Sequence, residues 1–202
     1  MRFLNLFGFG LAWLAIESAQ FPTEGRNVNS KTTANIQSRS GWDDLPTFEL
    51  SELSKSGYPE DGVTSFNVKI DPKTAEAKKL SSNEIWVRIS YAVNTELEVH
   101  KALQAEDITP QILAIVNLEG VRVGFVSEYL KLARQAERKE DKDACREVLE
   151  TMHKKGWVHG DPNTGNFLIL GKKVYVIDFE TAEKATSDLI IVDFKRFDTA
   201  FW

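Results

Sequence analysis

Hydrophobic and polar positions follow a regular pattern only from about residue 62 onward. Alternation with a period of two predicts strands at 63–70 and 84–92. A turn and a short helix are expected between them, at 71–80. Two apolar runs on either side of Leu-Glu-Gly, at 112–116 and 121–128, predict a hairpin. The first part of this region is therefore expected to be mainly β-sheet.

Two stretches have apolar residues at the spacing of an α-helix. The first, 95–105, begins at Thr95, whose hydroxyl is suited to cap the helix N-terminus. The second, 143–157, is amphipathic, and we expect Asp143 to cap its start and Gly156 to end it. Its predicted buried stripe consists of Cys145, Val148, Leu149 and Met152.

After the second helix the chain has a polar loop and a second, shorter hairpin. Its strands, 167–170 and 174–177, are separated by the turn sequence Gly-Lys-Lys. Strands with one helix, then a hairpin, a long helix and another hairpin make a mixed α+β architecture. We place the division between its two parts near residue 130.

The first 60 residues have a different composition. Residues 1–20 contain an apolar run, Phe3–Ile16, which fits a secretory signal, an apolar helix that packs on the body, or a membrane-surface segment. Residues 21–60 are rich in Ser, Thr, Asn, Gly and Pro, which predicts a linker or poorly ordered arm, although the scattered apolar residues of 41–53 could dock elsewhere. Cys145 is the single cysteine, so no intrachain disulfide supports secretion. A secreted protein without enzymatic activity is what residues 1–20 alone would favour.

The composition excludes some classes of partner. The 202 residues are 42% hydrophobic and 27% charged, with a formal net charge of −5, which is typical of a soluble globular protein. A nucleic-acid-binding protein would have a basic surface, so we expect no nucleic-acid partner, and we expect no membrane partner. The expected location is cytoplasmic, or secreted if residues 1–20 are a true signal. An acidic protein can still bind a polyanion such as ATP where metal ions and a few cations neutralise the phosphates.

The candidate chemistry lies in the polar loop His-Gly-Asp-Pro-Asn-Thr-Gly-Asn, residues 159–166, and in Val-Tyr-Val-Ile-Asp-Phe-Glu, residues 174–180. Asn166 leads into the first strand of the short hairpin and Asp178 follows the second, so both should lie at the same end. A carboxylate and an amide oxygen at one point suit Mg²⁺, which is usually shared with substrate phosphates. Asp161 could then accept a hydrogen bond from a hydroxyl group that attacks phosphorus.

These residues resemble the catalytic and metal-binding segments of the protein-kinase-like superfamily. His-Gly-Asp, with Asn five residues after the Asp and then Asp-Phe-Glu, is the form of aminoglycoside and choline phosphotransferases, and it is similar to that of uncharacterised fungal kinase-like proteins. The resemblance is specific over 143–183 and looser over 84–130. It implies a two-lobed α+β fold, with an N-lobe at 61–130, a reduced C-lobe at 131–202 and a poorly ordered N-terminal arm.

The resemblance implies a role for each matching residue of the loop and hairpin. Asp161 corresponds to the catalytic aspartate, which orients or deprotonates the acceptor hydroxyl. Asn166 and Asp178 correspond to the two magnesium ligands, and Asp178 also bridges the metal to the phosphates. The resemblance therefore implies ATP and Mg²⁺ as cofactors.

Further matches lie before residue 131. Arg88 stands where the family has a phosphate-contacting lysine, and Glu96 (or, as the alternative, Glu98) matches the helix glutamate that pairs with it. Arginine keeps the positive charge of lysine but is larger and forked. The hinge between the lobes would bind the adenine edge through the backbone of Glu128, Tyr129 and Leu130.

The function that the resemblance implies is an ATP- and Mg²⁺-dependent phosphotransferase. It would move the γ-phosphate to a hydroxyl group of a small molecule or of a protein Ser or Thr, so its partners would be a nucleotide and that acceptor. Three departures favour an alternative, a pseudokinase that binds nucleotide or acts as a scaffold without catalysis. Arg88 replaces the lysine, no Gly-rich loop precedes its strand, and few residues follow Asp178.

Overall fold

The computed structural model describes residues 42–53, 65–69, 80, 84–137 and 139–202. The chain divides into two units, 1–38 and 39–202, and every described element belongs to the second unit. The apolar segment 1–20 and most of the turn and helix predicted at 71–80 lie outside the described residues.

The N-terminal half of the described unit is built on a five-stranded sheet. Its strands are β1 (Thr47–Glu49), β2 (Ser65–Lys69), β3 (Glu84–Ile89), β4 (Ile112–Leu118) and β5 (Val121–Glu128). They lie in the order β1-β4-β5-β3-β2, and all neighbours are antiparallel except β1 and β4. The two predicted strands and the predicted hairpin are thereby confirmed, except that β3 ends at Ile89 and not at 92. Residues 63, 64 and 70 of the first predicted strand lie outside the described residues.

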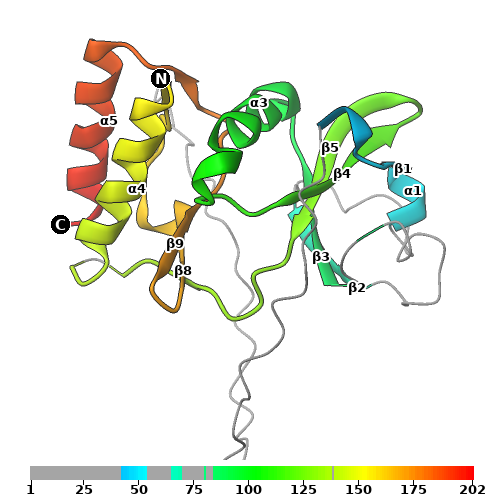
Figure 1. Ribbon diagram of the computed structural model, residues 1–202, viewed down its shortest axis with the longest axis horizontal. Coiled ribbons are helices and arrows are strands. Elements are labelled where there is room, and N and C mark those ends of the chain that lie inside the picture. The colour runs from blue at the N-terminus through cyan, green and yellow to red at the C-terminus, as the bar shows by residue number, and fades with distance from the viewer. Residues whose placement is uncertain (1–41, 54–64, 70–79, 81–83, 138) are drawn as a thin grey trace, which may run out of the picture. The chain divides into compact units, whose positions relative to one another are not determined.

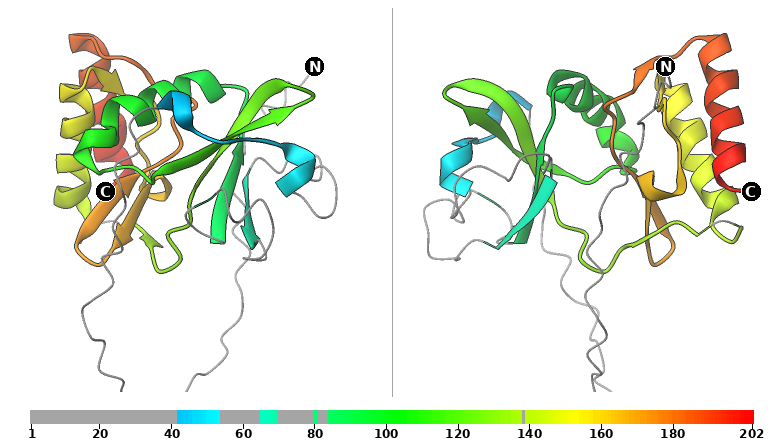
Figure 2. Two further views of the ribbon diagram at one scale, coloured as in Figure 1. Left: turned by 45° about the vertical axis from the view of Figure 1, so that its right-hand side comes forward. Right: turned by 180° about the vertical axis from the view of Figure 1, so that it is seen from behind.

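The end of the expected linker is part of the fold, which corrects the assignment of 21–60 for residues 42–53. These residues form a short 3-10 turn (Trp42–Asp44), β1 and the single-turn helix α1 (Leu50–Leu53). β1 adds to the edge of the sheet beside β4, and Phe48 is fully buried there. Figure 2 shows this segment in blue alongside the sheet. The few apolar side chains of this segment are enough to fix it in place, because they pack against apolar residues of the sheet.

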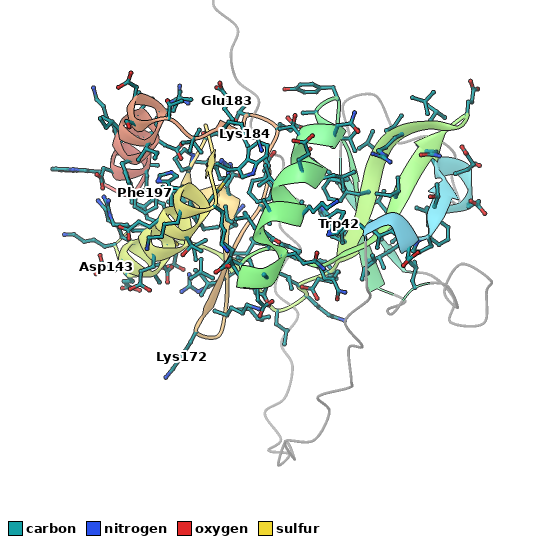
Figure 3. The ribbon with its side chains drawn as sticks, turned by 45° about the horizontal axis from the view of Figure 1, so that its top comes forward. Trp42, Asp143, Lys172, Glu183, Lys184 and Phe197 are labelled. Atoms are coloured by element: carbon teal, nitrogen blue, oxygen red, sulfur yellow. The ribbon has the colours of Figure 1, made fainter. Side chains whose placement is uncertain are left out.

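Helix α3 (Val93–Leu103) lies on one face of the sheet (Figure 1). It begins two residues before Thr95, so the predicted cap at Thr95 is wrong. Ala92 is the N-cap residue, its carbonyl accepts the amide of Glu96 at 3.0 Å, and the Ser90 hydroxyl holds the Ala92 amide. Trp42 of the 3-10 turn also contacts this region, because its indole donates a hydrogen bond to the side chain of Gln104, just beyond the helix (Figure 3).

Helix α4 (Lys142–Lys154) buries the predicted stripe of Cys145, Val148, Leu149 and Met152. Its N-cap residue is Asp141 and not Asp143, so the helix begins two residues earlier than the predicted cap implies. The Asp141 carboxylate binds Arg134 and the Glu137 amide instead of capping the helix. Gly156 follows the helix with φ of 84°, which is the left-handed conformation that ends helices.

Two short sheets and a last helix complete the described unit. The hairpin of β8 (Phe167–Leu170) and β9 (Lys173–Val176) confirms the second predicted hairpin, and Lys172 at its tip points away from it (Figure 3). The strand β6 (Arg134–Gln135) pairs with β8, and β7 (Trp157–Val158) pairs with β10 (Glu183–Lys184). Helix α5 (Ser187–Ala200), which the sequence analysis did not predict, runs beside α4 (Figure 1).

Helix α5 is held by its own cap and by aromatic packing. The Thr186 hydroxyl accepts the Leu189 amide at the start of the helix. Phe197 is fully buried, stacks on Phe201 with ring centroids 4.4 Å apart, and meets Phe167 edge-on at 5.8 Å. None of the described helices is both long enough and apolar enough to cross a membrane.

Replacing Phe48 by alanine tests whether β1 belongs to the core. We expect Phe48→Ala to lower the free energy of unfolding by about 3 kcal/mol, because it leaves a cavity beneath the sheet edge. Urea denaturation measures this change. Tyr91→Ala, at a side chain that is 88% exposed, is the matched control and should change stability by less than about 0.5 kcal/mol. An equally small effect at Phe48 would show that β1 is dispensable.

Candidate functional site

The polar loop between β7 and β8 is fixed by its own side chains. Asn163 accepts the Gly165 amide at 2.8 Å and donates to the Asp161 carboxylate at 2.9 Å. The Asn166 side-chain amide donates to the Asp161 carbonyl at 2.9 Å. Asn166 is buried whereas the Asp161 carboxylate is exposed. The loop therefore presents one carboxylate to solvent on a backbone that hydrogen bonds hold on both sides.

His159 ties this loop to the end of β9. Its Nε2 lies 3.0 Å from the Ile177 carbonyl, and its Nδ1 accepts the Asp161 amide at 3.3 Å. Because Nδ1 accepts, the proton of the neutral ring is on Nε2, which donates to Ile177. Complete burial lowers the pKa of His159 and so favours this neutral form. His159 thus has a structural role in this arrangement.

Asn166 and Asp178 flank the β8–β9 hairpin at its open end, Asn166 directly before β8 and Asp178 shortly after β9. The Ile177 amide donates to the Asn166 carbonyl at 3.0 Å, and Asp178 is the next residue along the chain. Asp178 has φ of 67°, a left-handed conformation that Asp tolerates better than most residues. The two side chains therefore start from the same end of the hairpin, and the positive φ takes Asp178 out of the regular alternation of β9.

Arg88 connects strand β3 to the segment after β9. Its Nη2 donates to Asp178 Oδ1 at 2.7 Å and to Glu180 Oε1 at 2.5 Å. Its Nε lies 3.6 Å from Oε1 of Glu96, which is only 1% exposed. Glu98, the alternative partner considered from sequence, is exposed to solvent. Glu96 is therefore the glutamate of α3 that faces Arg88.

The cluster around Arg88 carries more negative than positive charge. Three carboxylates, those of Glu96, Asp178 and Glu180, share one guanidinium. Burial raises the pKa of Glu96 and of Glu180, against the opposing effect of Arg88, and the charge of Asp178 raises both further. Another cation at this point would reduce the repulsion among the carboxylates.

Several backbone groups of the expected hinge already make hydrogen bonds within the protein. The Glu128 amide donates to the Gln111 carbonyl at 2.9 Å, so this amide is already used. The Tyr129 carbonyl accepts the Lys131 amide at 3.0 Å, and the Leu130 carbonyl accepts the Ala133 amide at 2.9 Å. The hinge is therefore a turn whose carbonyls are largely internal.

Asp193 of α5 holds the backbone of the polar loop through hydrogen bonds, and sequence reasoning did not identify this residue. Its carboxylate accepts the amides of His159 and Gly160, both at 2.9 Å, and the His153 ring nitrogen at 2.8 Å. Burial by itself raises the pKa of Asp193, but these hydrogen bonds outweigh it and hold the pKa below its ordinary value. An aspartate between apolar residues, in Leu-Ile-Ile-Val-Asp-Phe, was the available signal.

Gly160 shows how closely the chain approaches itself at the loop. It has φ of 83°, and a Cβ atom there would lie 2.2 Å from the Thr181 carbonyl. The Thr181 hydroxyl also donates to the His159 carbonyl, and Arg196 of α5 donates to the Gly160 carbonyl. Only glycine fits this position.

Comparison with known proteins identifies the type of the segment. Residues 110–191 match the model of the APH phosphotransferase enzyme family. The segment is kinase-like. The match spans β4 through the start of α5, and so it contains the polar loop and the Asp-Phe-Glu motif. It confirms the recognition of the protein-kinase-like superfamily that the sequence motif indicated.

Other comparisons add little beyond the kinase-like match. No curated protein matches the chain. Among the solved structures that match is the kinase PK-1 of Cydia pomonella granulovirus, with 16% sequence identity and a TM-score of 0.36. The alignment covers 50% of this chain and 45% of the viral chain, so the chain spans about half the length of that kinase.

Two further residues of the kinase-like segment belong to the site, although the sequence did not indicate a role for them. Glu180 shares Arg88 with Asp178, and Asp193 anchors the loop. In the described part of the chain no group of three His, Cys, Asp or Glu side chains could hold a metal ion. The expected pair of Asn166 and Asp178 is of a different kind, because it combines an amide with a carboxylate.

Replacing Asp193 by asparagine tests its role as the anchor of the loop. We expect Asp193→Asn to lower the free energy of unfolding by about 2 kcal/mol at pH 7, because a charged acceptor of several buried hydrogen bonds is lost. The folded pKa lies below the ordinary value of 3.8, so the stabilisation is complete above that pH and disappears as the pH falls through the folded pKa. Denaturation of both proteins at several pH values measures this.

The control for Asp193 is Asp188, which is exposed in the first turn of the same helix. Asp188→Asn should cost less than about 1 kcal/mol, the usual size of a helix-dipole effect. If the difference between wild type and Asp193→Asn were the same at pH 7 and at pH 3, the proposed charge effect would be wrong.

Replacing Glu96 by glutamine tests the charge excess around Arg88. Burial raises the folded pKa of Glu96 above that of the unfolded chain, so the ionised carboxylate costs stability at neutral pH. We expect Glu96→Gln to increase the free energy of unfolding at pH 7 by about 1 kcal/mol, the size usual for relieving a charge conflict. The gain should vanish as the pH falls and the wild-type carboxyl becomes protonated. Glu98→Gln, exposed on the same helix, should have no such pH-dependent effect.

Proposed function

We propose that this protein is an ATP- and Mg²⁺-dependent phosphotransferase, which moves the γ-phosphate to a hydroxyl group of a small molecule or of a protein. The observation that carries the proposal is the contact of Arg88 with Asp178. It places a buried guanidinium from β3 against the carboxylate that follows the β8–β9 hairpin. A positive side chain beside oxygen ligands is what a bound triphosphate requires.

Asn166 and Asp178 would hold the Mg²⁺ ion. The donor set fits, because an amide oxygen and a carboxylate are hard ligands of the kind that Mg²⁺ prefers. The Asn166 nitrogen is committed to the Asp161 carbonyl, so its oxygen is the atom left for a ligand. When bound, the ion would supply positive charge that offsets both the phosphates and the excess of carboxylates around Arg88.

Asp161 would orient the acceptor hydroxyl and accept its hydrogen bond. The Asp161 carboxylate is exposed, and His159, Asn163 and Asn166 all hold it or its backbone. A fixed carboxylate contributes by alignment and as a general base, typically about 10²- to 10⁴-fold in rate. Arg88 would bind the phosphates, and its ion pair with Glu96 would hold the Arg88 guanidinium in position.

The observed ion pairs also favour a second candidate, a pseudokinase that binds nucleotide without catalysis. Arg88 is already paired with Asp178 and Glu180, and a phosphate must compete with both carboxylates for it. Arginine also cannot be exchanged for lysine without changing the geometry of phosphate contact. The two candidates differ in one respect, since only the first forms a phosphorylated acceptor.

Three aspartate variants distinguish these functions. We expect Mg·ATP, but not ATP with EDTA, to raise the melting temperature of the wild type, because a ligand that binds the folded state stabilises it. Asp178→Asn should remove this shift, and Asp161→Asn should keep it while reducing phosphate transfer to an acceptor panel of amino sugars, choline and Ser/Thr peptides at least about 100-fold. Asp107→Asn is the control, because Asp107 also has a positive φ, of 54°.

The outcomes are separable. Binding with acceptor phosphorylation at the same background level in wild type and Asp161→Asn would exclude catalysis and leave the pseudokinase. An equal melting-temperature shift in wild type and Asp178→Asn would remove Asp178 from the metal site. No shift and no transfer at millimolar Mg·ATP would contradict nucleotide binding altogether.

A further inference from the structure

Helix α5 has a second apolar face, which its own fold does not bury. Phe197 and Phe201 fill the core from one side of the helix. On another side lies a hollow of about 460 Å³, and the residues that line it, which we call the outer stripe, are Ile191, Phe194, Lys195, Asp198, Thr199 and Trp202. Ile191 is 66% exposed and Trp202 is 91% exposed. Exposed apolar residues that gather on one surface are typical of a surface that binds a partner.

The order of residues in the outer stripe is complementary to itself. In a two-fold symmetric contact the same surface of both copies is used, so that if one residue meets a second, the second also meets the first. An antiparallel pair of α5 helices that places Lys195 of one copy against Asp198 of the other satisfies this condition. The same register brings Ile191 opposite Trp202 and Phe194 opposite Thr199. Apolar residues therefore meet at both ends, and opposite charges meet near the axis.

Charge favours this register over its neighbours. Sliding one helix along the other in one direction places Lys195 opposite Lys195 of the second copy, and sliding it in the other direction places Asp198 opposite Asp198. Like charges at an interface are unfavourable, and this repulsion suppresses incorrect arrangements. The charged residues of the stripe thus set the orientation and the register of the contact.

Both of these charged side chains are accessible. Lys195 is exposed and has no ion-pair partner among the described residues. The Asp198 side chain is 45% exposed, although it is bound by Arg146 at 2.5 Å and by Lys142 at 3.0 Å. These hydrogen bonds hold the pKa of Asp198 below its ordinary value, so the carboxylate is ionised at neutral pH. Because it already has two cations, Lys195 of a second copy contributes to register more than to affinity.

The surroundings of the stripe are nearly neutral, although the chain is acidic. Helices α4 and α5 together contain five Lys or Arg residues and six Asp or Glu residues, which gives a formal net charge of −1. The whole chain has a net charge of −5. Two copies of an acidic protein repel one another in general, and they meet with little of that repulsion at these helices.

We propose that two copies of this chain associate through the outer stripe of α5 as an antiparallel, two-fold symmetric helix pair. Burial of Ile191, Phe194 and Trp202 drives the association. One helix pair buries less surface than a permanent interface, so the dimer is weak and depends on concentration. Asp193, which anchors the polar loop, lies on the buried side of α5 and takes no part in the contact. The inference does not depend on the proposed phosphotransferase activity.

Sedimentation velocity over a range of protein concentrations tests the association. We expect the wild type to change from monomer to dimer as its concentration rises from micromolar to millimolar. Ile191→Glu places a charge in the apolar part of the stripe and should lower the association constant at least about tenfold, equivalent to about 1.4 kcal/mol. Val192→Glu is the matched control, because Val192 is 43% exposed on the same helix but lies outside the stripe. It should associate as the wild type does.

Mixed cysteine variants test the register. Ile191→Cys and Trp202→Cys are prepared separately, and the native Cys145 is buried and does not compete. In oxidised glutathione, a mixture of the two proteins should form a disulfide-linked dimer. Each protein alone should form little, because the two copies of either cysteine lie about 16 Å apart along the antiparallel helices.

The contrary results are distinct. A monomer at every concentration would refute the association. A dimer that Ile191→Glu and Val192→Glu weaken equally, or that neither weakens, would place the interface on another surface and also refute it. Equal disulfide formation in the mixture and in either protein alone would refute the antiparallel register. Circular dichroism and melting temperatures verify that each variant is folded.

Discussion

The site depends on one buried cation, Arg88, and on the carboxylates that surround it. Glu96 comes from α3, whereas Asp178 and Glu180 follow β9, so the guanidinium joins elements that are far apart in sequence. Removing charges from water is costly, and a group of three carboxylates around one cation repays that cost only partly. Such an arrangement is poor for stability and is the kind of charge conflict that functional sites retain.

The remaining parts of the site are positioned by rigid elements. Asp193 on α5 fixes the backbone of His159 and Gly160, and His159 in turn binds the carbonyl of Ile177 beside Asp178. Phe179, between the two carboxylates that bind Arg88, is fully buried and meets the His159 ring at 5.6 Å. The backbone of the loop is thus supported by the buried side chains of His159 and Asp193, which helps to hold a reactive geometry.

Local patterns carried much of the prediction. The amphipathic stripe of α4 and both hairpins follow from the spacing of apolar residues and from turn sequences, so they could be predicted from sequence. The relation of Asn166 to Asp178 also follows locally, because a short hairpin returns its two ends to the same place. The resemblance to kinase-like proteins added roles to these positions that spacing alone does not contain.

Tertiary partners determined what the sequence did not show. β1 has only one deeply buried residue, Phe48, and its pairing with β4 cannot be inferred from three residues. The start of α3 was misplaced because the Ser90 hydroxyl, and not Thr95, organises it. Asp193 is a single polar residue in an apolar stretch, and its partners lie some 33 to 40 residues earlier in the sequence. Effects of this kind depend on contacts that no local pattern encodes.

The central claim is that Asn166 and Asp178 bind one metal ion beneath a triphosphate that Arg88 also contacts. Paramagnetic relaxation measures this directly, with Mn²⁺ in place of Mg²⁺ and the side-chain amide resonances of asparagine as probes. Mn·ATP should broaden the Asn166 amide resonance far more strongly than that of Asn94, which is exposed on α3. If Mn·ATP binds and the Asn166 resonance is broadened no more than that of Asn94, the metal lies elsewhere and the account is wrong.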